Sequence, residues 1–182
     1  NSLGILDAED FIEHLQPNDQ HYTVSRLICL ENTLNRGGGC IYPLDKVHEI
    51  RRFADKHGLR MHLDGARLFN AVVATGITAA QWAAPFDTVS ICLSKGLGCP
   101  VGSLLLGPRD LLATQGIRLR KVLGGAMRQA GILAGAGNYA LDHHIDRLAM
   151  DHAHAQLFAT AGTKVHYLNW SFRSPPIWCG FG

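Results

Sequence analysis

Short apolar segments alternate with helix-like segments along this chain of 182 residues, and this alternation is the feature that most constrains its fold. Apolar runs predict strands at residues 25–31, 59–63, 88–93 and 102–106. Apolar periodicity and capping residues predict helices at residues 7–15, 43–57, 66–75 and 132–157. Strands that alternate with helices are typical of an α/β fold with a mainly parallel sheet.

A lysine follows the third predicted strand. Lys95 lies in Ser94-Lys95-Gly96, directly after the apolar run at residues 88–93. Because burial disfavours the charged form of lysine, a lysine in this position can lose its proton and act as a nucleophilic amine. Such an amine is what a covalent bond to a carbonyl cofactor requires. A solvated loop lysine is the alternative interpretation of the same residue.

An aspartate occupies the equivalent place after the second predicted strand. Asp64 ends the segment His62-Leu63-Asp64 and precedes Gly65. A lysine for the aldehyde and an aspartate for the pyridinium nitrogen form the expected pair for pyridoxal phosphate. Both residues are predicted at the carboxyl ends of strands, where ligands bind in open α/β sheets. The alternative for Asp64 is a turn aspartate or a helix cap.

Composition narrows the possible partners and the compartment. A net charge of +2 gives no reason to expect nucleic acid or a membrane surface as a partner, and no apolar run approaches the length of a membrane span. The five cysteines are an odd number without metal-ligand spacing, which predicts a reducing, cytoplasmic location and no metal site. Cys29 and Cys92 lie in apolar runs and are expected to be buried.

At this point four blocks of the sequence resemble the low-specificity L-threonine aldolases, which are fold-type-I pyridoxal-phosphate enzymes. The blocks are 30–33 (LENT), 62–71 (HLDGARLFNA), 92–103 (CLSKGLGCPVGS) and 120–129 (RKVLGGAMRQ). The resemblance implies a three-layer large domain, incomplete at both ends, at residues 1–158. Residues 159–182 are expected to be a tail outside it. We therefore expect this chain to be an internal fragment.

The resemblance also implies roles for individual residues. Lys95 would form the internal aldimine, and Asp64 would keep the pyridine nitrogen protonated. Arg67 would lie near the cofactor's phenolic oxygen and the substrate carboxylate, and an ion pair on the helix it opens is the alternative. Ser94 and His62 would lie beside the cofactor, although a satisfied core histidine is as good an interpretation of His62. The implied reaction cleaves L-threonine or L-allo-threonine to glycine and an aldehyde, in a homo-oligomer (dimer or tetramer).

One residue departs from the family pattern. The family usually has histidine after Glu-Asn-Thr, beside the substrate hydroxyl, and this chain has Leu34. Two alternatives therefore stay open: a β-eliminating lyase of similar fold, and a non-catalytic remnant of an aldolase. A nucleotide-binding fold of Rossmann type is disfavoured, because Gly96-Leu97-Gly98 lacks the third glycine of that motif.

Overall fold

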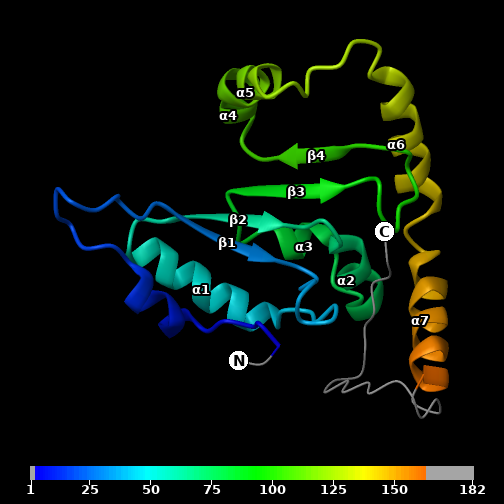
Figure 1. Ribbon diagram of the computed structural model, residues 1–182, viewed down its shortest axis with the longest axis horizontal. Helices are drawn as coiled ribbons and strands as arrows, with labels where there is room; N and C mark the ends of the chain where they lie inside the picture. Colours follow the sequence, from blue (N-terminus) through cyan, green and yellow to red (C-terminus); the bar gives the residue numbers. More distant parts are fainter. Residues whose placement is uncertain (1–2, 163–182) are drawn as a thin grey trace.

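A single four-stranded sheet organises the chain, and the computed structural model describes residues 3–162 (Figure 1). Its strands lie in the order β1 (Leu27–Glu31), β2 (Arg60–Asp64), β3 (Thr88–Cys92) and β4 (Ser103–Leu106). The first three strands run parallel, and β4 is antiparallel to β3. The predicted α/β fold with a mainly parallel sheet is therefore confirmed.

Three helices pack against one face of this sheet: α1 (Leu44–Lys56), α2 (Leu68–Thr75) and α3 (Ala79–Ala83). A 3-10 helix (Ala8–His14) lies against α1. The apolar stripe of α1 explains its orientation, because Val47, Ile50 and Ala54 recur at helical spacing and are all buried. Alternate strand residues such as Leu63 and Val89 meet these helices and complete the core. Each large aliphatic side chain buried there contributes about 1.5–3 kcal/mol.

The chain after β4 forms a second group of helices. They are α4 (Arg109–Leu111), a π-helical turn (Leu112–Gly116), α5 (Ile117–Val122), α6 (Gly131–His143) and α7 (Leu148–Gly162). α6 packs on the segment that follows β3, through a small apolar cluster that contains Leu93, Leu97 and Ala140. α7 packs against α2. Within the described residues, no helix is long and apolar enough to cross a membrane.

The single helix predicted at residues 132–157 is wrong, because residues 144–147 separate two helices. No glycine or proline marks the break in the sequence. The physical reason is tertiary: the break allows His144 to bond the backbone of the loop after β3. The predicted tail begins inside α7, which continues to Gly162, and residues 163–182 lie outside the described residues.

The predicted burial of Cys29 and Cys92 is also wrong. Cys29 is exposed and Cys92 is half-buried. Side chains alternate along a strand, and Ile28, Leu30 and Ile91 take the face that packs on the helices. The two cysteines therefore share the opposite face of the sheet with Glu31, His62 and Asp64.

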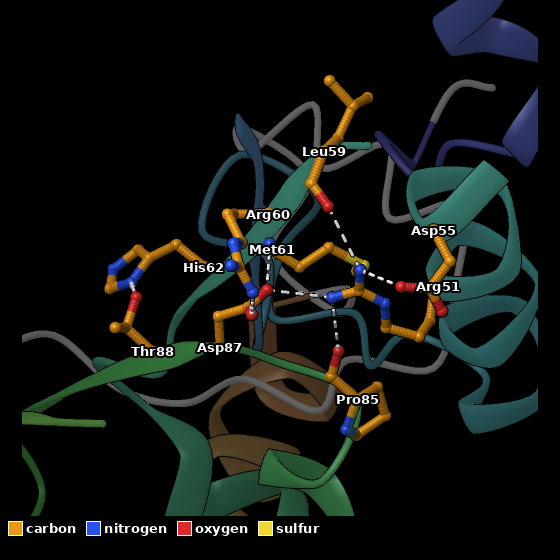
Figure 2. A network of polar contacts seen from close by, with 9 residues as sticks. All are labelled: Arg51, Asp55, Leu59, Arg60, Met61, His62, Pro85, Asp87 and Thr88. Carbon is orange, nitrogen blue, oxygen red and sulfur yellow. Dashed lines mark hydrogen bonds and ion pairs between the residues drawn. The ribbon is translucent and has the colours of Figure 1, made fainter. Parts of the chain in front are cut away.

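A polar network ties the amino-terminal edge of the sheet together (Figure 2). The Asp87 carboxylate accepts hydrogen bonds from Arg51 Nη1 at 2.9 Å, Arg60 Nη1 at 2.9 Å and the Met61 amide at 2.8 Å. Burial alone would raise the pKa of Asp87, but hydrogen bonds from the amide and the two guanidinium groups outweigh it and lower that pKa below its ordinary value. The polar groups at this edge thus bind one another and are not available to a ligand. The candidate site is therefore sought at the carboxyl-terminal edge of the sheet.

Candidate active site

Polar residues end neighbouring strands at the carboxyl-terminal edge of the sheet. Glu31 ends β1 and is in register with Asp64, which ends β2; Asp64 in turn is in register with Ser90 of β3. The chain leaves β3 at Cys92 and reaches Lys95 in the following loop. Because β2 and β3 run parallel, the strand end with Asp64 and the loop with Lys95 lie at the same edge.

Asp64 uses one of its two carboxylate oxygens locally. Its Oδ1 accepts a hydrogen bond from the Ala66 amide at 3.1 Å, which is the turn role that the sequence left open. Within the described residues its Oδ2 has no hydrogen-bond partner. The side chain is exposed on the face of the sheet away from α1. Burial, and secondly the negative charge of Asp64, raise the pKa of the Cys29 thiol on this face. Asp64 can therefore accept one further hydrogen bond from a ligand.

Arg67 stands just ahead of α2 and reaches back towards β1. Its Nη1 lies 4.0 Å from Oε1 of Glu31, and the two side chains are 15% and 33% exposed. The alternative interpretation of Arg67 places its ion pair on its own helix, whereas the observed partner ends β1. At 4.0 Å the pair is loose, so the guanidinium keeps donors that a bound carboxylate or oxyanion can use.

His62 bonds across the sheet rather than along its own strand. Its Nδ1 lies 2.7 Å from Oγ1 of Thr88, the residue in register with it on β3, and its side chain is half-buried. It shares the face of Asp64, because alternate residues of β2 point the same way. The bond orients the imidazole between the two strands that carry the candidate residues.

Lys95 and Ser94 lie in a tight loop. The Gly98 amide donates to the Lys95 carbonyl at 2.8 Å, and the Cys99 amide donates to the Leu93 carbonyl at 3.0 Å. Lys95 is half-buried and Ser94 is exposed. The sequence predicted a desolvated lysine, and the loop shields this one only in part. No side chain within the described residues bonds the Lys95 ammonium.

Asn32 and Thr33 are two buried polar residues that the sequence did not mark as candidate site residues. They follow Glu31 directly and are 2% and 1% exposed. The Asn32 amide group and the Thr33 hydroxyl make no hydrogen bond within the described residues. Buried polar groups without partners are uncommon in native proteins. Their only sequence signal was their place in the Leu30-Glu31-Asn32-Thr33 block.

The sequence of the chain matches a known protein family. The model of the beta-eliminating lyase family matches residues 1–171 of the chain. The chain belongs to this family. Among its relatives, the low specificity L-threonine aldolase of Escherichia coli K12 is 45% identical over 156 residues, which is 86% of this chain and 46% of that protein. The predicted resemblance to these aldolases is therefore confirmed.

Other relatives agree on the family and the fold. A probable low-specificity L-threonine aldolase 2 of Arabidopsis thaliana is 43% identical over 150 residues, which is 82% of this chain and 42% of that protein. This chain spans less than half the length of these two curated relatives. The threonine aldolase structure from Leishmania major matches with a TM-score of 0.80 at 23% identity, over 97% of this chain and 52% of that one, which shows the shared fold.

The residues at this edge of the sheet fit pyridoxal phosphate in their chemistry. A carboxylate with a free oxygen suits a pyridinium N–H, a primary amine suits an aldehyde, and a guanidinium suits an oxyanion. Asp64, Lys95 and Arg67 supply these groups at one edge of the sheet. Within residues 3–162, no group of three or more His, Cys, Asp or Glu side chains could hold a metal ion.

Proposed function

We propose that this chain is part of a pyridoxal-phosphate-dependent aldolase, a carbon–carbon lyase that cleaves L-threonine, L-allo-threonine and related β-hydroxy amino acids. The products would be glycine and an aldehyde. The observation that carries this proposal is the placement of Asp64 and Lys95 at one edge of two neighbouring parallel strands. Membership of the beta-eliminating lyase family, and the aldolase names of the relatives, support it.

Lys95 and Asp64 would hold the cofactor at two points. The amine of Lys95 would bond the aldehyde carbon, and the free Oδ2 of Asp64 would accept a hydrogen bond from the protonated pyridine nitrogen. When bound, pyridoxal phosphate supplies an electron sink for the pair released as the Cα–Cβ bond breaks. The negative charge of Asp64 keeps that nitrogen protonated, because an opposite charge within a few ångströms favours the charged form of its partner. Ser94 and His62 would flank the cofactor.

Arg67 would bind the substrate. A guanidinium presents parallel N–H donors that match a carboxylate, so Arg67 suits the α-carboxylate of an amino acid. Its ion pair with Glu31 is loose, so the guanidinium of Arg67 stays beside Glu31 and still has N–H donors for a substrate. Glu31 would thus hold the guanidinium in place before substrate arrives.

Leu34 affects where the proton of the substrate hydroxyl can go. It is held in an isolated bridge, where its amide donates to the Cys40 carbonyl and its carbonyl accepts from the Gly39 amide, both at 2.8 Å. Its aliphatic side chain cannot take a proton. A well-placed base contributes about 10²- to 10⁴-fold to such a step, so we expect slow cleavage unless another group serves.

Leu34 also favours a second candidate, a β-eliminating lyase, which needs no base at a β-hydroxyl. The two reactions differ in their products. Cleavage of L-threonine by the aldolase yields glycine and acetaldehyde, whereas elimination yields ammonia and a keto acid.

We also propose that the working protein is a homo-oligomer, a dimer or tetramer, in the cytoplasm. The aliphatic residues Leu104, Leu105 and Leu106 of β4 are 40–53% exposed at the edge of the sheet, as at a subunit contact. The thiols of Cys29, Cys40, Cys92 and Cys99 are free, which suits a reducing compartment. Threonine catabolism and glycine formation would be its metabolic role.

The test is a product analysis on the purified chain with pyridoxal phosphate and L-threonine or L-allo-threonine. The proposal expects glycine and acetaldehyde in equal amounts, lost in Lys95→Ala and retained in Lys56→Ala, which changes an exposed lysine of α1. If the products are ammonia and a keto acid, the chain is a β-eliminating lyase and not an aldolase. No product that depends on Lys95 would identify the chain as non-catalytic.

A further inference from the structure

The loop that carries Lys95 packs against the junction of α6 and α7. This junction, residues 144–147, lies between His143 and Leu148. Because no described side chain bonds the Lys95 ammonium, the place of that amine depends on the backbone of residues 95–98. What holds this backbone therefore decides where the amine points.

His144 bonds that backbone directly. Its Nδ1 lies 2.6 Å from the carbonyl oxygen of Leu97, a residue that is 3% exposed. A carbonyl oxygen only accepts hydrogen bonds, so Nδ1 carries the proton and donates it. A Cβ atom at Gly98, which has a φ of +74°, would stand 3.5 Å from the same nitrogen. The imidazole thus lies against the loop at two consecutive residues.

A second contact from the start of α7 holds the other end of this loop. The side chain of Leu148 is 1% exposed, and its Cδ2 would stand 2.7 Å from a Cβ atom at Gly96. The backbone of residues 96–98 is therefore contacted at each position by His144 or Leu148. Lys95 is the residue immediately before this contacted stretch.

We propose that His144 is a positioning residue for Lys95. Its Nδ1–H donates to the Leu97 carbonyl, fixes the loop on the α6–α7 junction and so holds the half-buried Lys95 amine in one place. The inference rests on the proposed role of Lys95, but the contact itself involves only residues of this chain and can be tested without cofactor.

Variants of His144 can place a hydrogen-bond donor at the position of either imidazole nitrogen. In His144→Asn the side-chain amide nitrogen takes the place of Nδ1 and keeps the donor. His144→Gln places its amide nitrogen farther out, where Nε2 stood, and His144→Ala removes the donor. The control is His154→Ala, an exposed histidine of α7.

Two readouts apply to the chain without pyridoxal phosphate. The first is reductive methylation of Lys95 by formaldehyde and cyanoborohydride, counted by peptide mass spectrometry against exposed Lys56 in the same sample. The second is hydrogen exchange of the Gly98 and Cys99 amides. Loss of this hydrogen bond would release the loop and expose the half-buried Lys95 amine, so we expect both rates to rise about five- to tenfold in His144→Ala and His144→Gln. His144→Asn and His154→Ala keep the wild-type values.

The inference is overturned if His144→Gln matches wild type in both readouts, or if His144→Asn behaves like His144→Gln. The comparison of these two variants decides the question even if His144→Ala fails to fold. Binding of pyridoxal phosphate is measured separately. If wild type binds none on Lys95 while the variants still differ as expected, the proposed function fails and the positioning contact stands.

Discussion

Arg67 Nη1 lies 4.0 Å from Glu31 Oε1, and this contact joins the start of α2 to the end of β1 at the candidate site. A pair at this distance contributes at most about 1 kcal/mol to stability. We therefore expect Arg67→Gln to change the melting temperature little. It should weaken substrate binding, because a charge-assisted bond to a carboxylate is worth about 1.5–3 kcal/mol, or about 10- to 150-fold in Kd.

The measurement is the Kd of L-threonine from the spectral change of the chain loaded with pyridoxal phosphate. Arg52→Gln is the matched control, since Arg52 also lies 4.0 Å from a glutamate, Glu49, but on the exposed surface of α1. If Arg67→Gln and Arg52→Gln have equal Kd values for L-threonine, Arg67 does not bind the substrate.

Asp87 provides a test of the opposite edge. Asp87→Asn replaces the acceptor of two guanidinium groups and one amide (Figure 2), and we expect a loss of about 2 kcal/mol in the free energy of unfolding at neutral pH. The pKa of Asp87 is lowered in the folded chain. The stabilisation is therefore complete above the unfolded pKa of about 3.9 and is lost as pH falls through the lowered pKa.

Urea denaturation across pH measures this effect. The difference between wild type and Asp87→Asn should shrink in acid, while Asp142→Asn, at an exposed aspartate of α6, should stay close to wild type throughout. A difference that stays constant down to the lowest pH would contradict the lowered pKa.

The contact between α2 and α7 that includes His152 should also make the stability of the chain depend on pH. Its Nε2 lies 3.2 Å from Nδ2 of buried Asn70, and burial, partly offset by the charge of Asp151, lowers the pKa of His152. The folded chain thus favours the neutral imidazole. The stability contribution is complete above the unfolded pKa of about 6.5 and is lost as pH falls from there through the lowered pKa.

We expect His152→Gln, which keeps an acceptor for the Asn70 amide, to lose stability less steeply than wild type as pH falls below about 6.5. Thermal unfolding over that range measures the slope. His154→Gln, an exposed neighbour on α7, serves as the control and should keep the wild-type slope. An unchanged slope in His152→Gln would assign the pH dependence to other groups.

Gly96 tests the packing of the Lys95 loop. In Gly96→Ala the new methyl group would stand 2.7 Å from Leu148 Cδ2, so we expect a loss of about 1–3 kcal/mol from overpacking. Gly135→Ala should instead stabilise α6 by up to about 1 kcal/mol, because nothing lies within 4 Å of its Cβ position.

Combining Gly96→Ala with Leu148→Ala relieves the clash. The double variant should therefore lose less stability in urea denaturation than the two single variants summed. Strict additivity would mean that these two residues do not contact one another.

The elements that local pattern determines were predictable from the sequence. The apolar stripe of α1 and the three parallel strands follow from spacing alone, and Gly76 ends α2 in the left-handed conformation that its type favours. The break at His144 was not predictable, because a bond to Leu97, distant in sequence, stabilises it. The exposure of Cys29 was missed for a similar reason: an apolar run does not reveal which face of a strand is covered.

Some features of the candidate site could also be predicted from the sequence, and others could not. The location of Asp64 and Lys95 at one edge of the sheet was predictable, because each follows an apolar strand. The observed partner of Arg67 was not, since Glu31 comes close only when β1 and β2 pair in register. The contacts of Asn70 with His152 and of His144 with Leu97 also depend on helices that pack after the sheet has formed.

The most direct test of the account locates the bond between pyridoxal phosphate and the chain. The chain is incubated with the cofactor, reduced with borohydride and digested, and each lysine peptide is quantified by mass spectrometry. We expect modification to be concentrated on Lys95, lost in Lys95→Ala and reduced in Asp64→Asn, with Lys56 modified only at background level. Modification spread evenly over exposed lysines, or unchanged by Asp64→Asn, would contradict it.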